Sequence, residues 1–164
     1  MDFIRDHAVP FVARLALGFF LAGIAAGVGY LGAWVIVISF FEMTPRTIDA
    51  MAIGAIGIGA GAGGSLAWID PEGSRSQFAL TVAVGIMGAL IGAWIGQLIG
   101  KGAYIQSGMP GIAELSGLVQ GAIVAANVAP MLLFFTRAVQ RRIWPPEPLS
   151  ASREGRRARS RPSA

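Results

Sequence analysis

Apolar residues fall into four long runs along the chain, separated by short polar segments. The runs cover approximately residues 11–41, 48–69, 77–101 and 111–139. Crossing the hydrocarbon core of a bilayer takes about 20 helical residues, so every run is long enough to span a membrane. The first and last runs exceed this length, and we expect them to tilt or to begin in the interface. The pattern predicts an all-α membrane protein with four transmembrane helices.

The segments between the runs are rich in residues that end helices. They contain Pro45, Pro71 and Pro110, each next to a Thr, Asp or Gly. Such residues are typical of turns and of helix starts. Because short connections place consecutive helices side by side and antiparallel, we predict one four-helix domain. Its predicted limits are residues 11–142, with an N-terminal segment at 1–10 and a tail at 143–164.

The composition is typical of a membrane protein rather than of a soluble enzyme. Of the 164 residues, 54% are hydrophobic, 13% are charged and 23 are glycine. Soluble domains carry about twice that share of charge and about half that share of glycine. The chain has no Cys and one His, His7, which excludes thiolate sites and multi-histidine metal sites within one chain. We predict that the protein is not an enzyme and binds no cofactor or metal.

The basic residues predict the orientation in the membrane. Under the predicted topology, Arg5, Arg14, Arg75 and the eight arginines from Arg137 onward share one side, and only two basic residues lie on the other. Cytoplasmic segments near membrane spans carry an excess of Lys and Arg. We therefore predict a protein of the cytoplasmic (inner) membrane with both termini in the cytoplasm. The first run is far longer than a signal-peptide core, so we expect it to remain uncleaved.

Small residues recur at every third or fourth position in all four runs. Helices do not associate in lipid by the hydrophobic effect, and small residues let their backbones approach closely, as in GxxxG motifs and glycine zippers. The pattern predicts a tightly packed Gly-rich bundle. Gly59 and Gly63 lie on another face of the second helix, which therefore has two faces for packing. The predicted packing residues are Gly54, Gly57, Gly61, Gly64, Gly88, Gly92, Gly96, Gly100, Gly117 and Gly121.

Three amide side chains lie inside the runs. Gln120 and Asn127 are seven residues apart, which places them on one face of the fourth helix, and Gln97 belongs to the third. Pro130 cannot bond to the carbonyl of Ala126, which leaves a free acceptor next to Asn127. One interpretation is a set of interhelical hydrogen bonds worth about 0.6 kcal/mol each. The other is a solute or ion path at a kinked helix.

Two carboxylates follow the prolines that start the second and fourth helices. Asp49 and Glu114 each lie four residues after a proline. A carboxylate in the first turn of a helix gains about 0.3–1 kcal/mol from the helix dipole, which is a sufficient reason for both. The alternative is an outward-facing acidic mouth paired with Lys101.

The C-terminal end of the chain is strongly basic. Arg137, Arg141 and Arg142 follow the last run, and Arg156 and Arg157 belong to a Pro/Ser/Arg-rich tail. A segment with almost no apolar residues cannot bury a core, so we expect this tail to be disordered. Each arginine close to a membrane adds about 1 kcal/mol of attraction to anionic lipid. We predict contact with anionic headgroups; an acidic partner subunit or RNA is the alternative, with nucleic acid less favoured.

Two functions fit these features. The first is a structural or assembly subunit that packs through Gly-rich helix faces against other membrane subunits or further copies of itself. The alternative is a small channel, transporter or holin-like pore former with a polar path at Gln97, Gln120 and Asn127. A pore needs a polar lumen, and three amides are few. The sequence therefore favours the structural subunit.

Overall fold

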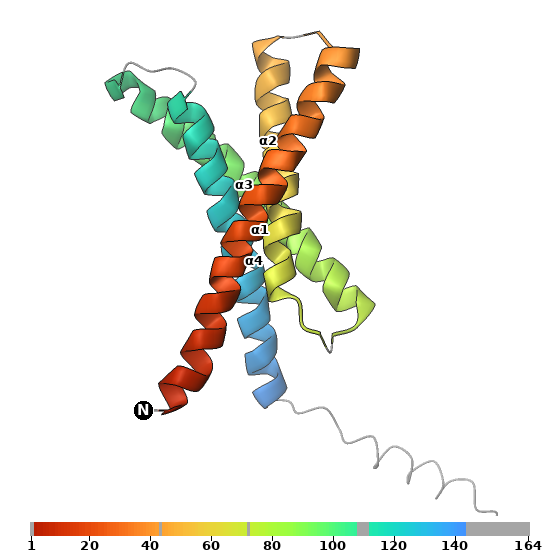
Figure 1. The fold of residues 1–164 in the computed structure, drawn as a ribbon, viewed down its shortest axis with the longest axis vertical. Coiled ribbons are helices and arrows are strands. Elements are labelled where there is room, and N and C mark those ends of the chain that lie inside the picture. Colours follow the sequence, from red (N-terminus) through yellow and green to blue (C-terminus); the bar gives the residue numbers. More distant parts are fainter. Residues whose placement is uncertain (1, 43, 72, 108–111, 144–164) are drawn as a thin grey trace, which may run out of the picture. The chain divides into compact units, whose positions relative to one another are not determined.

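The protein is helical throughout the part that the structure describes. A computed structural model describes residues 2–42, 44–71, 73–107 and 112–143, and no strand occurs within them. The elements in order are α1 (Asp2–Phe40), α2 (Pro45–Ser65), the short 3₁₀ helix η1 (Leu66–Trp68), α3 (Arg75–Ser107) and α4 (Ile112–Ile143). Consecutive helices run in opposite directions (Figure 1).

Four of these helices are long and apolar enough to cross a membrane. The candidate spans are Pro10–Phe40, Pro45–Trp68, Arg75–Gly102 and Ala113–Gln140. The predicted all-α architecture with four spans, expected of an integral membrane protein, is therefore confirmed at this level. The described residues from Phe135 to Ile143 belong to a second unit. All contacts described below lie within the first unit, Met1–Phe134.

The helices extend beyond the apolar runs at several ends. Residues 2–10, predicted as a segment before the domain, belong to α1, which contains Pro10. Helix α3 continues to Ser107, six residues past the predicted limit. The reason is that hydropathy marks where a helix can contact lipid, whereas the backbone hydrogen bonds of the helix continue into the interface. The predicted tail at 143–164 lies outside the described residues, apart from Ile143 at the end of α4.

The turn chemistry at the helix starts explains where α2 and α3 begin. Thr44 has extended backbone angles (φ −92°, ψ 153°), and its Oγ1 accepts a hydrogen bond from the Thr47 N–H at 3.2 Å. Pro45 occupies the first position of α2, where its missing N–H costs nothing. At the start of α3, Ser74 Oγ accepts from the Gln77 N–H at 3.3 Å. Both are N-caps of the kind that Ser and Thr form.

The core is built mainly of alanine. Large apolar side chains such as Phe20, Leu31 and Ile99 point outward instead, as expected where the surroundings are lipid. The largest fully buried side chains include Trp68, Leu118 and Asn127. The fully buried alanines are Ala22, Ala60, Ala89, Ala93, Ala122 and Ala126.

Candidate functional site

Helices α3 and α4 touch through glycine and alanine along a shared stripe. A β-carbon added at Gly88 would lie 2.6 Å from the β-carbon of Ala129, and one at Gly100 would lie 2.5 Å from the Ala113 carbonyl oxygen. The contacts advance one turn along α3 for each turn back along α4, as in an antiparallel pair. Between these ends, Gly92 lies against the backbone of Gly121, and Gly96 lies against the backbone of Gly117.

Helix α2 uses two faces. On one face, β-carbons added at Gly57 and Gly61 would lie 2.7 Å from Leu90 Cδ2 and 2.6 Å from the Gly85 carbonyl oxygen of α3. On the other face, Gly63 would meet the β-carbon of Ala25 of α1 at 2.7 Å. Gly59 lies against the backbone of Ala25 and Ala26. Helix α2 is thus in contact with α1 and α3 at the same time.

Two residues of the predicted second-helix stripe do not share its partner. No atom lies within 4 Å of a β-carbon added at Gly54, so this residue makes no close contact. At Gly64 the added β-carbon would be 3.1 Å from the carbonyl oxygen of Ala126, in α4 rather than in α3. Pro130 follows Ala126 by four residues and cannot bond to that carbonyl. Because Gly64 has no side chain, the Ala126 carbonyl can lie close to α2 at this point.

Asn127 is a satisfied amide in the core. Its Oδ1 accepts a hydrogen bond from Trp68 Nε1 at 3.3 Å, and its Nδ2 donates to the Ile123 carbonyl at 2.9 Å. The side chain is fully buried. It lies against Gly18 of α1, where any β-carbon would collide with Oδ1. Asn127 therefore joins α4 to η1 and to α1.

The three amides make no hydrogen bonds to one another in the described part of the chain, and the polar route stays a prediction. Gln120 is exposed, and its Nε2 donates to Ser116 Oγ on its own helix at 3.1 Å. Gln97 is only 6% exposed and makes no hydrogen bond with either of the other amides. The seven-residue spacing of Gln120 and Asn127 holds for a straight helix, but the helices that cover α4 change along its length. Asn127 is covered by α1 and Trp68, and Gln120 is not.

A shallow groove runs along the outer side of the α3–α4 contact. Its volume is about 380 Å³. The floor is backbone at four glycines, and the walls are exposed aliphatic side chains with the amide of Gln120 between them. The lining residues are Gly92, Ile95, Gly96, Ile99, Gly117, Gln120, Gly121, Val124 and Ala125.

One ion pair links α2 to α3 near their ends. Lys101 Nζ lies 3.1 Å from Asp49 Oδ2, and the two side chains are 43% and 47% exposed. The pairing of Asp49 with Lys101 is thus present. Glu114 lies instead where the backbone of α4 passes Gly100: a β-carbon added at Gly100 would be 2.7 Å from the Glu114 Cα. The two carboxylates are therefore on different helices with different neighbours.

Sequence reasoning missed a cluster at the other end of the first unit. The Trp68 ring packs between Phe11 (centroids 5.9 Å apart) and Phe134 (6.2 Å). The Arg14 guanidinium carbon lies 5.0 Å from the centroid of the Phe134 ring. The available signal was an arginine inside the first apolar run, three residues after its start at Phe11, but its neighbours come from distant parts of the chain.

Several predicted contacts with lipid or partners lie beyond this unit. Arg137 belongs to the second unit. The side chains of Arg141 and Arg142 and the whole of Arg156 and Arg157 are outside the described residues. Among the described residues, no group of His, Asp or Glu is arranged to hold a metal ion.

Neither the protein-family models nor the curated proteins nor the solved structures include a match to this chain. Function is therefore inferred from the residues themselves: the small-residue contacts, the groove beside Gln120 and the charged groups at the two ends.

Proposed function

We propose that the protein is a small polytopic inner-membrane protein that acts as a structural or assembly subunit of a larger membrane complex. Its helices pack through Gly-rich faces of the GxxxG or glycine-zipper type, both within the chain and toward a neighbour. The neighbour is another membrane subunit or a second copy of the chain. Both termini lie in the cytoplasm, and a disordered basic C-terminal tail contacts anionic headgroups.

The observation that carries this proposal is the groove along α3 and α4. Its floor is the line where glycines bring α3 and α4 together, with Gly92 and Gly96 buried, and its walls are exposed aliphatic side chains. Lipid chains fill such a narrow shape less well than the side chains of another helix. Gln120 lies in the groove about 10 Å along α4 from Ala113, inside the candidate span. A polar group facing lipid is costly, and Gln residues in spans commonly bond across helices. A partner helix would cover the groove and give Gln120 a second bonding partner besides Ser116 of its own helix.

The channel alternative has less support from the same residues. A solute path needs polar groups that converge, because lipid-exposed or core amides cannot replace a hydration shell. Asn127 uses both ends of its amide inside the bundle, and Gln120 faces outward from it. We therefore propose the structural role and not a pore.

The test is whether filling the groove releases a partner. Val124 lies on the groove wall and is 48% exposed, whereas Val35 of α1 is 67% exposed and lies outside the groove. We expect Val124→Trp to lose the proteins that co-purify with the tagged wild type in mild detergent and to shift its complex to smaller size. Val35→Trp adds the same bulk elsewhere and should keep the complex. A wild-type chain that purifies alone as a monomer, or equal loss in both variants, would contradict the proposal.

A further inference from the structure

Arg14 is a cation inside a candidate membrane span. Its side chain is partly buried, and Nη1 is buried without a hydrogen-bond partner. No Asp or Glu within the described residues forms an ion pair with Arg14, and Asp49 pairs with Lys101. Buried guanidinium donors without an acceptor are rare in folded proteins and call for an explanation, such as an ion that completes the site.

The ring of Phe134 stabilises the positive charge of Arg14 but offers no acceptor for its N–H donors. The guanidinium carbon of Arg14 lies 5.0 Å from the centre of the Phe134 ring, and such an aromatic face attracts a cation. The ring offers no oxygen or nitrogen acceptor, whereas the guanidinium has five N–H donors in a planar fork. Trp68, whose ring packs against Phe134, directs its own Nε1 to Asn127 and adds no acceptor. Nη1 is therefore a donor of Arg14 that lacks an acceptor.

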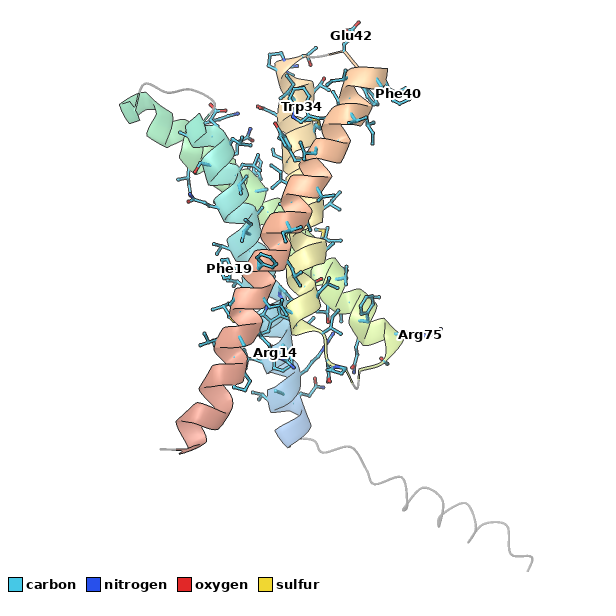
Figure 2. The ribbon with its side chains drawn as sticks, in the orientation of Figure 1. Arg14, Phe19, Trp34, Phe40, Glu42 and Arg75 are labelled. Carbon is cyan, nitrogen blue, oxygen red and sulfur yellow. The ribbon has the colours of Figure 1, made fainter. Side chains whose placement is uncertain are left out.

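The position of Arg14 in the span indicates which oxyanion is close by. The span begins at Pro10, so Arg14 lies about 6 Å along the helix from its start. This is the depth at which hydrocarbon gives way to headgroups, and long basic side chains reach toward headgroups from there. Figure 2 shows Arg14 toward the same end as Arg75 and away from Phe40 and Glu42. The abundant anions at this depth are phospholipid phosphates.

We propose that Arg14, backed by the ring of Phe134, binds the phosphate of a phospholipid in the leaflet around the N-terminal end of α1. The side chain extends toward the headgroup so that Nη1, which is buried in this structure, and a second N–H of the fork donate to two phosphate oxygens. Arginine favours this arrangement and lysine cannot form it. Lipids with a net negative charge bind best, because zwitterionic headgroups carry their own cation beside the phosphate. This site is independent of the partner proposed above and of the basic tail.

The experiment compares the full-length protein with two charge variants that differ in position alone. Arg14→Gln removes the proposed ligand, and Arg75→Gln removes an equal charge from an exposed residue at the start of α3. Each protein, in phosphatidylcholine-containing micelles, is titrated with phosphatidylglycerol, and the unfolding midpoint and the number of lipids retained in native mass spectrometry are measured. Because all variants keep the tail arginines, the non-specific attraction to anionic lipid is the same in each.

We expect phosphatidylglycerol to raise the unfolding midpoint of the wild type and of Arg75→Gln, with one lipid retained. For Arg14→Gln, the same rise in unfolding midpoint should require at least about five-fold more phosphatidylglycerol, and no lipid should be retained. Arg14→Lys keeps the charge and should be intermediate. If inorganic phosphate without phosphatidylglycerol reproduces the wild-type shift, the oxyanion site stands and the free ion is its ligand.

Equal weakening in Arg14→Gln and Arg75→Gln would overturn the proposal, since the effect would then follow net charge. If Arg14→Gln does not fold, the measurements on the wild-type protein alone still test the phosphate site. A wild-type protein with the same midpoint in phosphatidylglycerol, phosphatidylcholine and inorganic phosphate has no such site. Loss of the co-purifying partner leaves these readouts unchanged, so failure of the assembly proposal is distinguishable from failure of this one.

Discussion

Trp68 and Asn127, which are 59 residues apart in the chain, are joined by a buried hydrogen bond of 3.3 Å from the indole Nε1 to the amide Oδ1. The pair connects η1, which follows α2, to the middle of α4, and Gly18 of α1 lies against the same amide oxygen. Three segments thus meet at one polar contact inside a core that is mainly apolar. Asn127 is best explained as an element of the fold.

This contact can be measured with a double-mutant cycle. Trp68→Phe removes the donor, Asn127→Leu removes the acceptor at similar volume, and the pair is combined in a third variant. We expect a coupling free energy of about 0.6 kcal/mol and no more than about 1.7 kcal/mol, as for hydrogen bonds between membrane helices. Unfolding by titration with a denaturing detergent gives the stabilities. Strictly additive losses would show that the bond contributes nothing.

The glycines divide into close contacts and open positions, which predicts effects of opposite sign. Alanine is a better helix former than glycine by about 1 kcal/mol. At Gly54, where no atom lies within 4 Å of the added carbon, Gly54→Ala should leave stability unchanged or raise it. At Gly96 the same carbon would meet the Gly117 backbone, and forcing the helices apart should cost about 1–3 kcal/mol.

The two variants are each other's control, since they make the same substitution in the middle of a span. The free energy of unfolding in mild detergent is the measurement. Equal effects at Gly54 and Gly96 would mean that α3 and α4 do not approach each other as closely as the structure has them.

The sequence was sufficient for the four spans, because the length of an apolar run reports directly on membrane crossing. The spacing of Gly57 and Gly61 against that of Gly59 and Gly63 also indicated two faces on α2. The sequence could not predict which helix each face contacts. Gly64 continues the spacing of Gly61 but contacts α4 and not α3. Spacing gives the direction of a side chain from its own axis, and the neighbouring helix at that height depends on how all the helices cross.

The same reason explains the amides and Arg14. Gln120 and Asn127 share a face of α4, yet one is exposed and the other is enclosed by segments from elsewhere in the chain. The contact of Arg14 with Phe134 joins residues 120 positions apart. No local pattern in one helix carries that information.

The ion pair between Lys101 and Asp49 should contribute little to stability. Both partners are close to half exposed, and exposed pairs are worth about 0.2–1 kcal/mol. We expect Lys101→Gln and Asp49→Asn each to lower the free energy of unfolding by less than about 1 kcal/mol. Because salt screens exposed charges, the difference from the wild type should vanish at about 1 M salt. A loss that persists in high salt would contradict this assignment.

The proposed orientation leads to a separate prediction. With both termini cytoplasmic, reporter fusions placed after Ala164 and within residues 44–47 should report opposite compartments. The excess of basic residues on the side of the termini is the physical reason. Alkaline phosphatase, active outside the cytoplasm, and a fluorescent protein that folds inside it are suitable reporters. The same compartment for both positions would contradict the four-span topology.

The central claim is that the groove along α3 and α4 is covered by another protein helix, and site-specific cross-linking in the native membrane tests it most directly. A photoreactive amino acid replaces Val124 in the groove in one variant and exposed Val35 of α1 in the other. The account predicts a discrete protein adduct from position 124 and attachment to lipid alone from position 35. Lipid adducts alone at position 124 would contradict it.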